Sequence, residues 1–167
     1  MASNIYQDDV PVVAVIGVGY VGTHLVEGFS GEYRVFGFEV SAAWAAQLRQ
    51  EEKFRSKSNV SFTTDLKPVT HFLISVPTLL RSDRTVGTSY LESVLNTYAR
   101  PGATIVIKSS RVDPGRTGPP LTTVPEIISG LDSASLTSIT RLYSPIFQSL
   151  IPVSPEVAAM TKLYENC

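Results

Sequence analysis

The sequence predicts an α/β protein in which a parallel β-sheet is doubly wound, with helices on both faces. Apolar, β-branched runs of strand length alternate with longer runs of helical periodicity, and a glycine-rich turn joins the first pair. This alternation is typical of βαβ units, whose strands are parallel. The strand-like runs are residues 12–17, 34–40, 60–63, 71–76, 104–108 and 150–153.

Helical patterns fill much of the chain between these strands. They are residues 21–29, 42–53, 89–98 and 136–147. A further helix is expected from Ser154, which suits an N-cap, with Pro155 at the first helical position and Glu156 in the first turn. No glycine or proline stop follows before Cys167.

Composition bounds the class of protein. The chain has 167 residues, 43% hydrophobic and 17% charged, which is typical of a soluble globular domain. Its net charge of −1 and the lack of a basic stripe argue against nucleic acid as a partner. One cysteine, Cys167, allows no intrachain disulfide. The N-terminus has no signal-peptide pattern, and no apolar run is long enough to span a membrane. We therefore expect a cytoplasmic protein.

The glycine-rich turn carries the strongest functional signal. Gly17, Gly19 and Gly22 form a Gly-x-Gly-x-x-Gly motif between a strand and a helix, and Glu39 lies at the end of the next strand. This is the dinucleotide-binding fingerprint of a Rossmann-type domain, with the pyrophosphate at the helix N-terminus. Glu39 would accept hydrogen bonds from the adenosine ribose and repel a 2′-phosphate, which favours NAD over NADP.

Four segments together resemble the UDP-glucose/GDP-mannose dehydrogenase family. They are residues 15–22, 75–78, 107–110 and 152–166. The last segment is most similar to the branch of UDP-N-acetylhexosamine (UDP-GlcNAc and UDP-ManNAc) dehydrogenases. The resemblance implies an NAD-binding Rossmann domain over residues 1–153, with residues 1–9 as a disordered tail. Residues 154–167 would then begin the helix that joins the cofactor and substrate domains.

The resemblance also implies a chemistry and a set of residues. In this family NAD oxidises the hydroxymethyl group of a nucleotide sugar to a uronic acid, through a thiohemiacetal on a cysteine, for polysaccharide biosynthesis. The implied cofactor contacts are Gly17, Gly19, Tyr20, Val21, Gly22, Glu39, Val76, Pro77, Thr78 and Ser110. Lys162 and Asn166, four apart on one helix face, match the family's reacting centre. An exposed helix face, and ordinary strand-end capping by Thr78 and Ser110, are the alternative interpretations.

The chain departs from the family pattern in its second half. Ser110 directly precedes Arg111, where the family has a further helix, a strand and an active-site glutamate, so an internal deletion is expected at this junction. The doubly wound sheet would then lack one helix–strand unit. Cys167 follows the helix motif and does not match the catalytic cysteine. On this interpretation the family's cysteine segment and the UDP-sugar domain are absent.

Two further sets of residues have a structural interpretation. His24 and His71 are far apart, with no Cys/His/Asp cluster around them, so no metal site is expected. Trp44 and Leu48 are four apart and are expected to pack as a helix ridge.

Three functional hypotheses remain open at this level. In the first, the chain is the NAD-binding portion of a UDP-sugar 6-dehydrogenase and does not turn over alone, because covalent catalysis needs its nucleophile. In the second, it is a non-catalytic module that dimerises or associates with a full-length dehydrogenase through a stripe of Val157, Met160, Thr161 and Tyr164. In the third, it is an incomplete gene product.

Overall fold

The structure, a computed structural model, describes residues 10–76, 88–108 and 120–165. It divides into two compact units, Met1–Lys108 and Ser109–Cys167.

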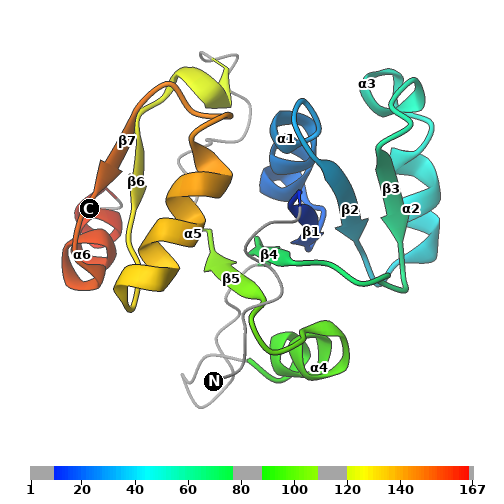
Figure 1. The fold of residues 1–167 in the computed structure, drawn as a ribbon. Helices are drawn as coiled ribbons and strands as arrows, with labels where there is room; N and C mark the ends of the chain where they lie inside the picture. Colours follow the sequence, from blue (N-terminus) through cyan, green and yellow to red (C-terminus); the bar gives the residue numbers. More distant parts are fainter. Residues whose placement is uncertain (1–9, 77–87, 109–119, 166–167) are drawn as a thin grey trace. The chain divides into compact units, whose positions relative to one another are not determined.

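The first unit is built on a five-stranded parallel sheet. The strands are β1 (Val12–Ile16), β2 (Arg34–Phe38), β3 (Val60–Thr63), β4 (His71–Ile74) and β5 (Thr104–Ile107). Their order is β3-β2-β1-β4-β5, and each neighbouring pair is parallel (Figure 1). The chain leaves β1 toward one side and returns through β4 on the other. This reversal is the switch point at which open parallel sheets bind ligands, and the predicted α/β fold is confirmed.

Helices cover both faces of this sheet. They are α1 (Tyr20–Phe29), α2 (Ala42–Leu48), α3 (Glu52–Arg55) and α4 (Ser89–Tyr98). Alternation along β1 sends Ala14 and Ile16 into a core with Val94 of α4. The intervening Val13 and Val15 are fully buried on the opposite face, and α1 packs on β1 and β2. Burial on both faces explains the unbroken apolar run of β1.

The single helix expected over residues 42–53 is instead two helices, α2 and α3. Leu48 and Phe54 are both buried, but in a continuous helix a separation of six residues would place them about 120° apart around the axis. The chain breaks after α2, where the Gln50 and Glu51 amides bond three residues back. The break lets the Phe54 ring meet the Phe62 ring edge-on, with centroids 4.9 Å apart.

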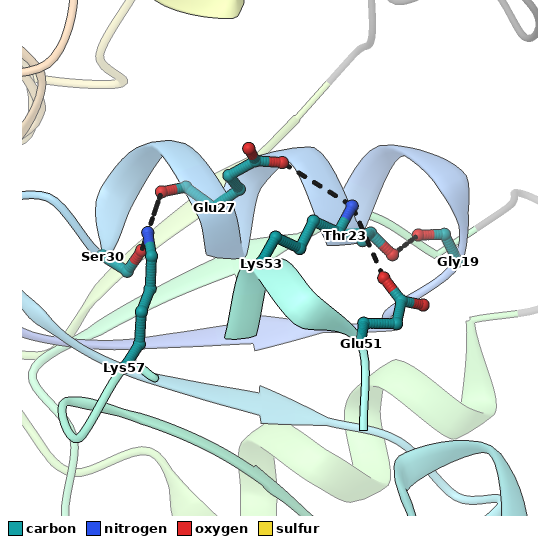
Figure 2. A network of polar contacts seen from close by, with 7 residues as sticks. All are labelled: Gly19, Thr23, Glu27, Ser30, Glu51, Lys53 and Lys57. Atoms are coloured by element: carbon teal, nitrogen blue, oxygen red, sulfur yellow. Dashed lines mark hydrogen bonds and ion pairs between the residues drawn. The ribbon is translucent and has the colours of Figure 1, made fainter. Parts of the chain in front are cut away.

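Side chains from the segment after α3 fasten the end of α1. Lys57 Nζ donates to the Glu27 carbonyl (3.5 Å) and to Ser30 Oγ (2.6 Å), as Figure 2 shows. Asn59 Nδ2 donates to the carbonyls of Ser30 (2.7 Å) and Tyr33 (2.8 Å). These donors reach carbonyls at and beyond the helix end, where intrahelical partners run out. Lys53 also lies 3.6 Å from Glu27, but this pair is too exposed to contribute much stability.

The second unit is smaller and is centred on one βαβ arrangement. A short 3₁₀ helix, η1 (Leu121–Thr123), precedes β6 (Glu126–Ile128), α5 (Ser133–Tyr143), β7 (Leu150–Pro152) and α6 (Pro155–Glu165). β6 and β7 form a two-stranded parallel sheet. The core contains Ile128, Ile139, Leu142, Tyr143, Ile146 and Phe147.

Two features of this unit differ from the expectation. β6 was not predicted from the sequence. The helix expected over residues 136–147 begins at Ser133, because the Asp132 carboxylate caps it by accepting from the Ser135 amide (2.7 Å). It ends at Tyr143, and Pro145 has no N–H with which to continue it.

Several expectations concern residues outside the described ranges. These include the tail at residues 1–9 and the deletion at Ser110/Arg111. The domain boundary at residue 153 stays a prediction. Among the described helices, none is long and apolar enough to cross a membrane.

Candidate functional site

The predicted dinucleotide turn follows β1 at the carboxyl edge of the first unit's sheet. Gly17 has φ +84°, a left-handed conformation that side chains rarely adopt. A Cβ added there would lie 2.6 Å from Val76 Cγ1. The Gly17 amide bonds the Phe38 carbonyl (3.0 Å), so the turn begins while the chain is still paired with β2.

Gly22 allows α1 to lie against this turn. A Cβ on Gly22 would overlap the Gly17 carbonyl oxygen and lie 2.8 Å from Ser75 Oγ. The Ser75 hydroxyl donates to the same Gly17 carbonyl (2.6 Å), which ties the end of β4 to the turn. Three segments therefore converge on one carbonyl, and only a hydrogen atom fits between them at Gly22.

Gly19 is different, because the space above it is open. A Cβ added there would meet no atom within 4 Å. Gly19 caps α1, whose first backbone bond runs from the Thr23 amide to the Gly19 carbonyl (2.9 Å). The amides of Val21 and Gly22 have no acceptor within the helix, as in any first turn, and such amides favour an anion. The open space thus lies at the positive end of a helix dipole.

The Glu39 carboxylate lies against the same turn. Its Oε2 accepts from the Val18 amide (3.2 Å), and its Oε1 accepts from the Ser41 amide (3.3 Å). Sequence spacing predicted that the acid would follow β2, and the structure brings it within hydrogen-bond distance of the glycine turn. A carboxylate has about four lone-pair positions, so two amides leave room for the hydroxyls of a ribose.

Aromatic side chains from two helices lie near Glu39. Trp44 on α2 donates its indole N–H to the Val18 carbonyl (2.8 Å), while Leu48 is fully buried. The ridge expected for Trp44 and Leu48 therefore does not account for the hydrogen bond that the Trp44 indole donates. Tyr90 on α4 has a raised pKa, first because it is partly buried and then because the negative charge of Glu39 is near.

The remaining predicted residues fall into two groups. Tyr20 is 42% exposed, with its ring edge-on to His24 at 4.9 Å between centroids, and Val21 and Val76 are half-buried. Lys162 lies on α6, but its side chain is not among those described. Outside the described residues lie Pro77, Thr78, Ser110 and Asn166. Within the described part of the chain, no three His, Cys, Asp or Glu residues are grouped to hold a metal ion.

Comparison with curated proteins gives a consistent set of relatives. The chain is 33% identical over 135 residues to UDP-N-acetyl-D-glucosamine 6-dehydrogenase of Pseudomonas aeruginosa, covering 71% of this chain and 32% of that one. It is 26% identical over 208 residues to the enzyme of the same name from Salmonella typhi, covering 92% of this chain and 48% of the other. Its relatives are UDP-sugar dehydrogenases. The resemblance predicted from the sequence motifs is confirmed, although no protein-family model matches the chain.

A solved structure shows the same fold. NDP-N-acetyl-D-galactosaminuronic acid dehydrogenase from Methanosarcina mazei Go1 superposes with a TM-score of 0.77 at 20% identity, over 96% of this chain and 47% of that one. The chain thus spans less than half the length of these dehydrogenases, and it is similar to their N-terminal, nucleotide-binding half.

The alignment lengths bear on the predicted deletion. The alignment with the Salmonella typhi dehydrogenase runs over 208 residues, which is more than the 167 residues of this chain. The relative therefore has residues that this chain lacks within the aligned region, as an internal deletion requires. Since the relatives are dehydrogenases, the cofactor class that this half implies is a nicotinamide dinucleotide.

Proposed function

We propose that the first unit binds NAD, with the pyrophosphate over Gly19 and the adenosine ribose on the carboxylate of Glu39. The observation that carries this proposal is the contact between Glu39 and the Val18 amide (3.2 Å), because it joins the acid to the glycine turn in one site. The positive end of α1 would stabilise the phosphates. Glu39 would repel the 2′-phosphate of NADP.

Thermal unfolding of the purified protein with NAD or NADP tests this proposal. A ligand that binds only the folded state raises its stability by RT ln(1 + [L]/Kd), so even weak binding raises the Tm at millimolar ligand. We expect a concentration-dependent rise with NAD and a smaller one with NADP. Glu39→Gln should reduce the Tm rise with NAD and narrow the difference between NAD and NADP. Glu32 is an exposed acid beyond α1, and Glu32→Gln should change neither quantity. A Tm that NAD leaves unmoved would contradict the proposal.

For the reaction, we propose that these 167 residues are the cofactor-binding part of a UDP-sugar 6-dehydrogenase and do not turn over by themselves. Lys162 and Asn166 would be inherited positions of the reacting centre, without the cysteine that carries the covalent intermediate. NADH formation with UDP-N-acetylhexosamines measures this directly. Clear turnover by the purified chain would show that the proposal is wrong.

A second proposal is that the chain associates with a full-length dehydrogenase through α6. It is supported by Val157 and Met160, which are three residues apart on α6 and 50% and 63% exposed. Co-purification with a full-length relative tests it, with Val157→Ser/Met160→Ser as the variant expected to abolish capture. Equal capture of the variant and the original chain would count against α6 as the surface.

A further inference from the structure

The residue at the centre of the glycine turn has both main-chain polar groups held by side chains from one neighbouring segment. Val18 lies between Gly17 and Gly19, and its side chain is fully buried. Its amide donates to Glu39 Oε2 (3.2 Å), and its carbonyl accepts from Trp44 Nε1 (2.8 Å). The segment that follows β2 therefore holds the turn through both main-chain polar groups of a single residue.

The same segment closes on itself. Ser41 caps α2 by accepting from the Trp44 amide at its Oγ (3.2 Å), and the Ser41 amide donates to Glu39 Oε1 (3.3 Å). Val18, Glu39, Ser41 and Trp44 thus form one ring of hydrogen bonds. The cap fixes the position of Trp44 at the start of α2, and the indole of Trp44 holds the glycine turn next to the Glu39 carboxylate.

The lengths of these bonds differ in a way that matters for a ligand. The two hydrogen bonds that backbone amides donate to Glu39 are at or just beyond the long end of the usual N–H···O range. The hydrogen bond from the Trp44 indole to the Val18 carbonyl is of ordinary length. Ribose hydroxyls would donate to the same carboxylate as these two amides, whereas the indole donates to the Val18 carbonyl instead. The hydrogen bond from Trp44 to the Val18 carbonyl would therefore remain when ribose hydroxyls hydrogen-bond to Glu39.

We propose that Trp44 is a positioning residue for dinucleotide binding, whose indole N–H holds the Val18 carbonyl so that the glycine turn and Glu39 face the adenosine ribose together. This inference rests on the proposed function, because it assumes that the dinucleotide binds at the turn. It differs from the simple ridge expected of Trp44 and Leu48, since a ridge would need only the ring and not its N–H. The distinction can be tested, because phenylalanine keeps an aromatic ring and removes the donor.

Calorimetric titration of NAD, ADP-ribose and nicotinamide mononucleotide into five proteins tests the inference. The proteins are the original chain, Trp44→Phe, Glu39→Gln and the double variant, with Gln47→Ala on the exposed face of the same helix as the control. Loss of one hydrogen bond should raise the Kd of NAD and of ADP-ribose about tenfold. Gln47→Ala should leave both unchanged. Because Trp44 acts through the ring that contains Glu39, the double variant should weaken binding by less than the product of the single effects.

Trp44 is the only tryptophan, so its fluorescence supplies a readout that needs no variant. Saturating NAD and ADP-ribose should each change its emission, and nicotinamide mononucleotide should not. If the original chain binds none of these ligands, the proposed function fails and the inference with it. If it binds them, then unchanged affinity in Trp44→Phe, full additivity with Glu39→Gln or an unmoved emission each overturns the inference and leaves the proposed function standing. Should Trp44→Phe not fold, the emission measurement decides.

Discussion

The two units bury their parallel strands to different degrees. In the first unit β1 has a strand on each side and helices over both faces, and Val13 to Ile16 are fully buried. In the described part of the second unit β7 pairs with β6 in a two-stranded sheet, and its Ile151 is 43% exposed. A parallel strand is stable when both faces are covered, so the first unit draws its stability from its sheet. The second depends on side chains of α5, such as Leu142 and Tyr143, which are buried.

The comparison also explains where the candidate site lies. The glycine turn, Ser75 and Glu39 all follow strands of the larger sheet, whose register fixes where each strand ends. Among the described residues of the second unit, Glu126 and the Tyr143 hydroxyl are buried, and the pKa of Tyr143 is raised by burial and by the charge of Glu126. Burying a carboxylate and a phenol in a small core is costly unless each is hydrogen-bonded.

The largest expected effects come from the same truncation in each unit. Leu73 on β4 and Leu142 on α5 are both fully buried, and Leu→Ala at such positions costs about 3 kcal/mol. If the units unfold separately, hydrogen exchange should rise across β1 and β4 in Leu73→Ala and across α5 in Leu142→Ala. Leu131→Ala, at a site 93% exposed, is the control and should change little.

Leu142→Ala should raise hydrogen exchange in its unit more than Leu73→Ala does in the first unit, because a small unit has few other core residues to retain its fold. Exchange that rises equally in both units for either variant would mean that the chain unfolds as one body. The division between the units would then have no energetic meaning.

A second pair of variants separates packing from binding within the first unit. Gly22→Ala should cost about 3 kcal/mol, since its Cβ meets the Gly17 carbonyl and Ser75, neither of which can move away cheaply. Gly19→Ala should change stability by less than about 0.5 kcal/mol, because nothing lies within 4 Å and its φ is −78°. It should nevertheless diminish the Tm rise with NAD.

Denaturant unfolding and the NAD titration measure both quantities on the same samples. Equal stability of the two glycine variants would refute the packing role of Gly22. If Gly19→Ala bound NAD as tightly as the original chain, the proposal that the pyrophosphate lies over Gly19 would be wrong.

The first unit could be predicted closely from the sequence because each signal there is local. The glycine spacing placed the turn and α1, and β-branched runs placed the strands to within two residues of their observed ends. β6 was missed because a three-residue strand that contains Glu126 has neither the length nor the alternation of a strand pattern. Asp132 was a usable N-cap signal for α5 that the sequence interpretation did not use.

The bond between Trp44 and Val18 could not have been predicted in the same way. It joins residues 26 apart, through an indole and a carbonyl that meet only once α2 has packed on the sheet beside β3. Hydrophobic spacing describes which face of a helix is buried, but it does not describe which carbonyl that face meets. The same limit explains the break between α2 and α3, which the tertiary position of Phe62 determines.

The smallest expected effect is a pH dependence confined to the second unit. The pKa of Asp132 is lowered, chiefly because its carboxylate accepts from the Ser135 amide at the start of α5. A lowered folded-state pKa contributes stability above the unfolded pKa, and this contribution is lost as pH falls through the folded-state value.

Asp132→Asn and Asp132→Ser keep a cap without a titrating group. Both should therefore be less stable than the original chain at neutral pH, by amounts that converge toward zero in acid. Exchange of the α5 amides from neutral pH into the acid range measures this, while β1 should show no such convergence. A gap that persisted unchanged at the acid end would mean that the carboxylate charge does not stabilise α5, and that hydrogen bonding by the cap alone holds the second unit's main helix.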